Sequence, residues 1–213
     1  MLDQNGTPSV ATILFLGNAP PPPPTGLVAA ALSTAQVSVT WNAPGVPINY
    51  YELQRSQSIF GPYTLVGLFP TTNFTDSNIT GLAPLTGYLY RVRAVDAQNI
   101  PSDFSNIDLA TTMSFTDNPL VAGTTVIRAQ HINELRTAVN AVRATAGFPQ
   151  VSWTDPSLPG VFIKAVHIME LRQNLNQALQ AMGLASPSYT DDPLSPGMIV
   201  KKIHVEEVRQ ATR

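Results

Sequence analysis

Three histidine–glutamate pairs are the residues whose type and spacing could do chemistry in this chain of 213 residues. Each pair has the form His-x-x-Glu, so on a helix both side chains would lie on one face. Glu-x-x-His pairs line di-metal sites in some helical bundles. Three such pairs could in principle bring three imidazoles around one metal ion. The pairs are His131 with Glu134, His167 with Glu170, and His204 with Glu207.

The same pairs have a second interpretation, which we favour. Each histidine lies four residues before an apolar helical position (Leu135, Leu171 or Val208), so it flanks the stripe that a core would bury. A partly buried imidazole that is hydrogen-bonded to its own glutamate, or to the aspartate of a Thr-Asp phrase, would explain the recurrence without a metal. The sequence contains no His-Glu-x-x-His zinc motif. We therefore predict no metal and no cofactor.

The pairs belong to an internal repeat whose consensus is aromatic-Thr-Asp, Leu, Gly, basic-x-x-His-φ-x-Glu-φ-Arg, where φ is Ile, Leu or Val. We interpret the aromatic residues as inter-repeat core and the aspartates as Asx-type turns or caps. The arginines would form inter-repeat ion pairs with those aspartates. Sugar stacking by the aromatic residues and calcium binding by the aspartates are the alternatives. The positions are Phe115, Trp153 and Tyr189; Asp117, Asp155 and Asp191; and Arg136, Arg172 and Arg209.

Helical periodicity predicts one main helix in each copy. The apolar stripes are Ile132, Leu135, Val139, Val142 and Ala146 in the first copy, and Ile168, Leu171, Leu175, Leu179 and Met182 in the second. Gly147 and Gly183 follow these stripes as expected C-terminal caps. A single copy cannot bury its own stripe, so we expect the copies to stack on one another. The third copy ends at Arg213, as an abbreviated cap or because the native chain continues.

Before the repeat, residues 25–112 alternate with period two between turn signals, which is the pattern of an antiparallel β-sandwich. Val37, Val39 and Trp41 share one face of their strand. Seven short strands fit one small sandwich. The expected strands are Gly26–Ala31, Gln36–Trp41, Tyr50–Arg55, Tyr63–Phe69, Asn73–Asp76, Gly87–Val95 and Ser105–Thr111.

The sandwich segment, about residues 24–112, resembles a fibronectin type III domain. The resemblance is carried by Trp41 and by the Leu-x-Pro-x-Thr-x-Tyr pattern that contains Leu82, Pro84 and Tyr88. It implies that Tyr88 is the corner tyrosine, whose hydroxyl ties its strand to the chain upstream. Leu82 would pack against this tyrosine, and Trp41 would anchor the core. The Arg-Gly-Asp tripeptide of integrin-binding family members is missing.

The repeat is weakly similar to S-layer homology repeats, which open with an aromatic-x-Asp phrase and later carry a basic-Ala step into a helix. The first copy has both phrases, at Phe115–Asp117 and Ile127–Ala129. The present repeats are shorter and lack that family's first helix. The resemblance would imply binding to a cell-wall polymer.

The N-terminal region divides into an apolar arm and a spacer. Residues 9–17 form an apolar run that is too short to span a bilayer and has no basic residue before it, so we predict neither a membrane span nor a signal peptide. We expect a β-strand that could pair with another copy, and a lone strand after Met1 suggests a fragment or a processed form. Residues 20–24 are five prolines, which favour a stiff polyproline II linker.

The predicted organisation is therefore all-β plus all-α. An arm (residues 1–19) and a polyproline linker (residues 20–24) precede a seven-stranded immunoglobulin-like sandwich (residues 25–112). Three helical repeats follow in residues 113–213, at residues 115–150, 153–188 and 189–213.

Composition narrows the possible functions. Charged residues make up 12% of the chain and the net charge is −2, so we expect no nucleic-acid partner and no membrane insertion. The chain has no cysteine and no catalytic motif, so we predict a protein that is not an enzyme. Our interpretation is a structural or interaction protein of a bacterial cell surface or secreted assembly, whose partners are other subunits, including copies of itself, or a cell-wall glycan. The alternative is a carbohydrate- or cell-wall-binding accessory module of a secreted hydrolase.

Overall fold

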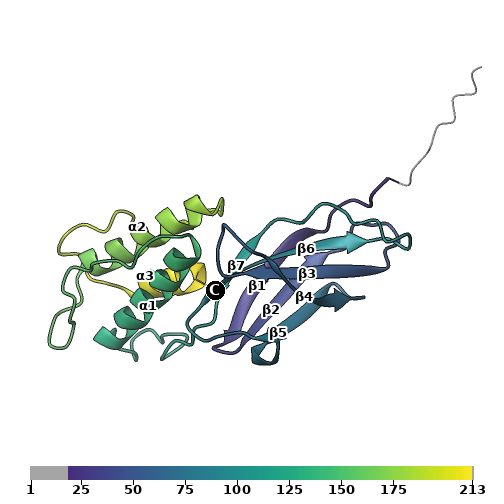
Figure 1. Cartoon of the computed structure of the whole chain (residues 1–213). Coiled ribbons are helices and arrows are strands. Elements are labelled where there is room, and N and C mark those ends of the chain that lie inside the picture. The colour runs from purple at the N-terminus through teal and green to yellow at the C-terminus, as the bar shows by residue number, and fades with distance from the viewer. Residues whose placement is uncertain (1–18, 213) are drawn as a thin grey trace, which may run out of the picture.

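A two-sheet sandwich and a three-helix unit make up the protein, as Figure 1 shows for the computed structural model, which describes residues 19–212. The predicted fold class is confirmed. One sheet has the order β1-β2-β5 and the other β4-β3-β6-β7, and all pairs are antiparallel. The elements are β1 (Thr25–Ser33), β2 (Gln36–Asn42), β3 (Tyr50–Ser56), β4 (Thr64–Phe69), β5 (Asn73–Ser77), β6 (Gly87–Val95), β7 (Asp108–Thr111), α1 (Ala129–Thr145), α2 (Ala165–Ala181) and α3 (Lys202–Ala211), with a 3-10 turn at Asn78–Thr80.

The strands form where the sequence alternates, because alternation places one row of side chains between the two sheets. On β2 the row is Val37, Val39 and Trp41, all buried. The Trp41 and Tyr51 rings meet edge to face with centroids 5.4 Å apart. This arrangement is favourable for aromatic pairs beyond the burial of their area. The inner face of the sandwich is thus an aromatic and β-branched core.

Tyr88 lies at the corner where the chain enters β6. Its hydroxyl accepts a hydrogen bond from the backbone N–H of Ala83 at 2.8 Å, and Leu82 lies buried in the same core. Next to it, the hydroxyl of Tyr90 donates to the fully buried carboxylate of Asp76 at 2.9 Å. Burial and the Asp76 carboxylate both raise the pKa of Tyr90. The Tyr88 hydroxyl therefore ties back the loop before β6, and the Tyr90 hydroxyl joins β6 to β5.

The last strand is shorter than the alternation predicts. It begins at Asp108 rather than Ser105, and the side chain of Asn106 just before it bonds to the backbone of β1. The Asn106 amide accepts from the N–H of Leu27 at 2.9 Å and donates to the C=O of Leu27 at 2.8 Å. The Asp108 carboxylate likewise accepts from the N–H of Ala29 at 2.8 Å. These bonds join β1 to the edge of the other sheet.

α1 and α2 end in the same way. Gly147 and Gly183 adopt positive φ values of 81° and 72°. After α1 the N–H of Phe148 donates to the C=O of Arg143 at 2.8 Å, and after α2 the N–H of Leu184 donates to the C=O of Leu179 at 2.9 Å. This pattern satisfies carbonyls that the helix leaves free, and glycine adopts its left-handed turn without a steric cost.

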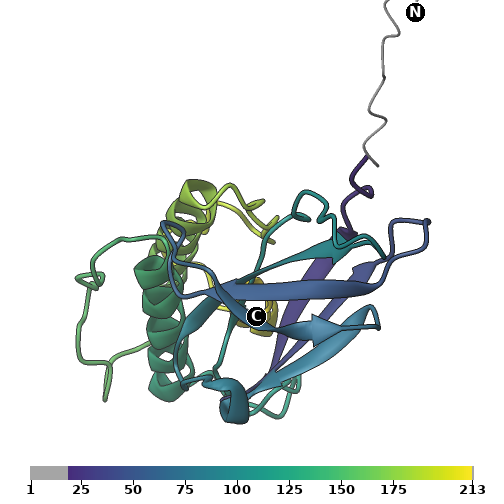
Figure 2. The same ribbon diagram turned by 45° about the vertical axis from the view of Figure 1, so that its right-hand side comes forward.

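The sandwich and the helices share a core, which the sequence did not predict. Leu89 on β6 and Leu109 on β7 turn away from the sandwich interior and are buried with the apolar stripes of the helices. Figure 2 shows the helices lying directly beside the strands. The N–H of Ile59 donates to the C=O of Thr145 at 2.9 Å, and a Cβ at Gly87 would clash with the Thr145 side chain. The two units are therefore packed into one body.

Candidate functional site

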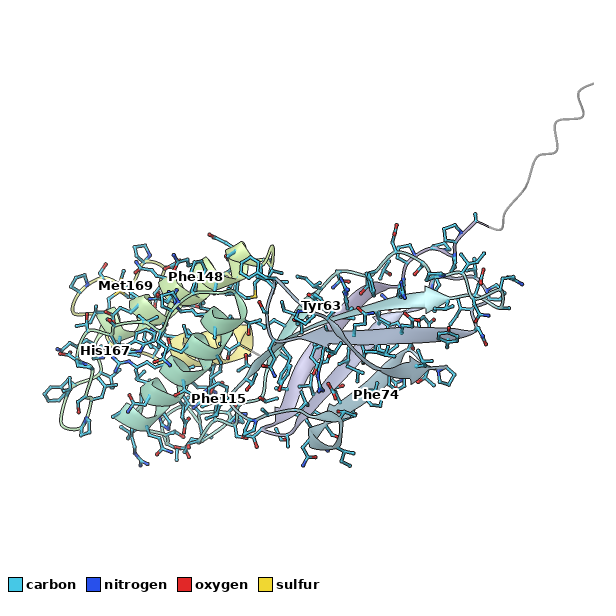
Figure 3. The ribbon with its side chains drawn as sticks, in the orientation of Figure 1. Tyr63, Phe74, Phe115, Phe148, His167 and Met169 are labelled. Carbon is cyan, nitrogen blue, oxygen red and sulfur yellow. The ribbon has the colours of Figure 1, made fainter. Side chains whose placement is uncertain are left out.

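The three repeat histidines lie buried at the beginnings of α1, α2 and α3. In the second copy, Nε2 of His167 lies 3.1 Å from Oδ2 of Asp155, and Nδ1 accepts the backbone N–H of Lys164 at 3.2 Å. Figure 3 labels His167 at the side of the helical unit away from the sandwich. The other copies repeat this geometry. The pairs His131 with Asp117 and His204 with Asp191 are also 3.1 Å apart, and Nδ1 accepts at 3.1 Å from Arg128 and Lys201.

These contacts fix the tautomer of each imidazole. A backbone N–H can only donate, so Nδ1 must be the acceptor. The proton then lies on Nε2 and points at the aspartate. Both ring nitrogens are occupied within the copy, and neither offers a lone pair to a metal. Over residues 19–212, no group of three or more histidine, aspartate or glutamate side chains is placed to hold a metal ion. The three pairs are thus spread over three separate helix ends.

The aspartates of the Thr-Asp phrases have backbone φ values of 49°, 50° and 51°. Aspartate is among the few non-glycine residues that enter this left-handed region readily. The ammonium groups of Lys164 and Lys201 also contact Asp155 and Asp191, at 2.8 and 2.7 Å. Hydrogen bonds from the lysine and then the histidine hold the pKa of each of these two carboxyls below its ordinary value. All three aspartates are therefore partners of a histidine, and Asp155 and Asp191 are also partners of a lysine.

The glutamate of each pair binds the neighbouring residue of the same phrase and not the histidine. Glu134 accepts the N–H of Thr116 at 2.9 Å, and Glu207 accepts the N–H of Thr190 at 2.9 Å. Glu170 accepts the N–H of Thr154 at 3.0 Å. The i, i+3 spacing that suggested a metal site thus places two side chains over two adjacent residues. The glutamate holds the threonine and the histidine holds the aspartate.

The arginines reach from each copy to the next. Arg136 donates to the carbonyl oxygens of Thr154 and Asp155 at 2.8 and 3.1 Å. Arg172 donates to the C=O of Thr190 at 3.0 Å and to Oε2 of Glu207 at 2.9 Å. We expected ion pairs with the carboxylates of the repeat aspartates; instead, these arginines bond to backbone carbonyls of the Thr-Asp phrases, and the carboxylate that accepts a hydrogen bond from Arg172 belongs to Glu207. The carboxylate of each repeat aspartate is already held by a histidine, which leaves the backbone carbonyls to the arginines.

The third arginine closes the series. Arg209, which is fully buried, donates to the carbonyls of Thr116 and Asp117 in the first copy, at 2.7 and 3.0 Å. The adjacent Glu206 accepts the N–H of Leu120, also in the first copy, at 2.7 Å. The order of contact is thus one to two, two to three, and three back to one. The three copies pack on one another around one core, as expected, and their contacts form a closed ring.

Each arginine also lies over the aromatic ring of the copy that it reaches. The guanidinium carbon is 5.2 Å from the ring centre of Trp153 for Arg136 and 4.5 Å from that of Tyr189 for Arg172. Arg209 lies 5.1 Å from the ring centre of Phe115, which Figure 3 labels between the helices and the sandwich. Burial lowers the pKa of Arg136, and the negative charges of Glu170 and Asp155 partly oppose this shift by raising it. The aromatic residues are therefore covered by cations at the junctions between copies.

Comparison with known proteins identifies the sandwich. Residues 22–107 match the fibronectin type III domain family. These residues form a fibronectin type III domain. The predicted family resemblance is confirmed for this part of the chain, and Trp41, Leu82 and Tyr88 all lie in its core. In the residues that the structure describes, no helix is long and apolar enough to cross a membrane.

Three bacterial enzymes contain similar segments. An alpha-amylase of Niallia circulans is 35% identical over 94 residues, which are 43% of this chain and 7% of the amylase. Chitinase Chi52 of Paenibacillus xylanexedens is 32% identical over 108 residues, 50% of this chain and 19% of the chitinase. Exoglucanase B of Cellulomonas fimi is 34% identical over 110 residues, 49% of this chain and 9% of the exoglucanase. The chain spans less than a fifth of the length of these relatives.

Proposed function

We propose that this chain is a non-catalytic, carbohydrate-binding accessory part of a larger bacterial protein that acts on polysaccharides outside the cell. The observation that carries the proposal is the similarity of the fibronectin type III domain to short segments of an amylase, a chitinase and an exoglucanase. The segment is a small fraction of each enzyme, which favours an accessory role over a catalytic one. This was the alternative in the sequence analysis, and it now stands ahead of a cell-surface or filament subunit.

The geometry of the repeats supports a non-catalytic role. A general base or a metal ligand needs a free lone pair that faces a substrate. The histidines instead use both ring nitrogens within their own copies, and the glutamates hold backbone N–H groups. The arginines are buried between copies. The polar groups most suited to chemistry are therefore the groups that hold the three-helix unit together.

The shared core supports a rigid spacer. Leu89 and Leu109 bury the outer face of β6 and β7 against the helices, so the domain and the three-helix unit move together. A rigid unit holds a flanking domain at a fixed distance better than a flexible linker does.

Retention on insoluble polysaccharides tests the proposal. The purified chain would be mixed with starch, chitin, cellulose and peptidoglycan and sedimented, with an unrelated acidic protein as the control. We expect retention on at least one polymer, reversed by the matching soluble oligosaccharide, and no release of reducing sugar. Failure to sediment with all four polymers would contradict carbohydrate binding.

A further inference from the structure

The end of the three-helix unit that lies away from the sandwich carries a concave apolar face. The three helices begin at this end and run toward the sandwich (Figure 1). The loops before them contribute residues from 121–129, 158–165 and 197–203 to a hollow of about 1040 Å³. We call these three loops the distal face. The polyproline linker lies at the opposite end of the molecule.

Each loop of the distal face exposes a large apolar side chain at the same repeat position. Val126, Phe162 and Ile199 are 65%, 89% and 81% exposed. Half-buried apolar residues, among them Ile127 and Ile163, line the hollow behind them. Contiguous apolar patches on soluble proteins mark interaction sites. An apolar residue exposed three times at one repeat position therefore indicates a surface that meets a partner.

The distal face is also basic. Four cations lie among its lining residues, Arg128, Lys164, Lys201 and Lys202, and none of the described residues that line the hollow is acidic. Lys164 and Lys201 contact aspartates, whereas Arg128 and Lys202 form no ion pair with the described carboxylates. Cations at the start of a helix oppose its macrodipole and cost stability. The aspartates already balance Lys164 and Lys201, so Arg128 and Lys202 are the cations of the described distal face that remain for negative charge on a partner.

The exposed apolar side chains and the cations of the distal face together indicate which kind of partner it binds. A second copy docked face to face would bring like charges together. A neutral glycan would call for several aromatic platforms, and the distal face exposes one aromatic ring, Phe162. Apolar side chains that project from loop tips within a ring of cations suit the interface of an anionic bilayer. The net charge of the whole chain is −2, although the described residues that line this hollow include four cations and no acidic residue.

We propose that the distal face binds the surface of an anionic lipid bilayer. Val126, Phe162 and Ile199 enter the interface between headgroups and acyl chains, and Arg128 and Lys202 contact lipid phosphates. The helices then point away from the bilayer, and the sandwich and the linker project outward from it. Such binding would retain the protein at a cell surface without a membrane-spanning segment.

Sedimentation with lipid vesicles tests this proposal on the whole chain. We expect binding to phosphatidylglycerol vesicles and none to phosphatidylcholine vesicles. The triple variant V126D/F162D/I199D should lose binding to phosphatidylglycerol. Ile79→Asp is the matched control, because Ile79 is 92% exposed on the sandwich, and it should bind like the unchanged protein. The double variant R128E/K202E should bind more weakly by roughly fivefold or more for each charge changed.

A gain-of-signal variant guards against misfolding. In Phe162→Trp, the added tryptophan should shift its emission to shorter wavelength when phosphatidylglycerol vesicles are added, and should not shift with phosphatidylcholine. Absence of both sedimentation and shift with phosphatidylglycerol would overturn the proposal and would leave an acidic protein segment as the better occupant. Binding that the aspartate triple variant retains in full would overturn it too, since that result would mean charge adsorption elsewhere on the chain.

Discussion

The fibronectin type III domain and the three-helix unit satisfy their buried backbone N–H and C=O groups in different ways. In the sandwich, strand ladders satisfy most backbone groups, so its core is mainly apolar and aromatic, and its buried carboxylate, Asp76, is paired with Arg55 at 2.6 Å. In the three-helix unit, long irregular loops connect the helices, and their N–H and C=O groups have no ladder. Buried backbone groups must still be paired. The histidines, glutamates and arginines pair them, so a repeated polar motif can be the equivalent of a β-ladder.

The largest test of this comparison is Arg209→Ala. The guanidinium is fully buried and joins the third copy to Thr116 and Asp117 of the first. Its loss leaves those carbonyls and Glu206 without a buried cation, and we expect the free energy of unfolding to fall by about 3–5 kcal/mol. Urea denaturation followed by far-ultraviolet circular dichroism measures it. Arg93→Ala in the sandwich is the control, because its pair with Glu52 is partly exposed and should contribute about 0–1 kcal/mol. Equal effects would contradict the comparison.

A second test addresses the boundary between the two regions. Leu89 is fully buried in the core that the domain shares with the helices. Leu89→Ala should cost about 3 kcal/mol through the cavity that it leaves. Trp41 lies in the sandwich and Trp153 in the helical unit, so the test uses a Trp153→Phe background in which fluorescence reports the sandwich alone. Because the core is shared, this fluorescence and the circular dichroism of the helices should still report one transition at a lower denaturant concentration. A destabilised helical signal beside an unchanged sandwich signal would show that the two regions fold independently.

A smaller effect is expected from His167→Ala. The change removes the acceptor of the Lys164 N–H and the donor to Asp155, and should cost about 1–3 kcal/mol. Thermal unfolding with and without a chelator checks it. Gln173→Ala on the exposed side of the same helix should change little. If the chelator destabilised the unchanged protein and had no effect on the variant, a metal role for the histidine would replace the packing role.

The smallest expected effect is a dependence on acid. The pKa values of Asp155 and Asp191 are lowered in the folded protein, so both carboxylates contribute stability above the ordinary aspartate pKa of about 3.9. That contribution is lost as the pH falls through the lowered values. The melting temperature of the unchanged protein should therefore fall at acidic pH below about 4 more steeply than that of D155N/D191N. Parallel curves would mean that these contacts add nothing.

The sequence predicted what depends on local pattern. The alternation at Val37, Val39 and Trp41 predicted the sandwich, and the stripes that include Ile132 and Ile168 predicted helices. The histidine–aspartate contact was one of two partners that the residues left open, because a side chain four residues before the core can turn either way. Its choice depends on the left-handed backbone of the aspartate, which no spacing reveals.

Contacts between distant residues were beyond the sequence pattern. Arg209 bonds to a carbonyl 92 residues earlier, and repeat similarity alone cannot tell an open stack from a closed ring. Glu206 occupies the repeat position of Asn133 and Met169. This difference was a signal that the third copy makes a contact that the other two lack, namely its bond to the N–H of Leu120. Leu89 was a second signal, since it is apolar on the outward face of an alternating strand.

Amide hydrogen exchange in Arg209→Lys tests ring closure most directly. Lysine keeps the charge but loses the planar fork that holds two carbonyls at once. The ring predicts faster exchange in the first copy, at the amides of Thr116 and Leu120, with less change at Thr154 in the second copy. An open stack predicts the opposite order, with the second copy affected and the first copy unchanged, and that result would contradict the account.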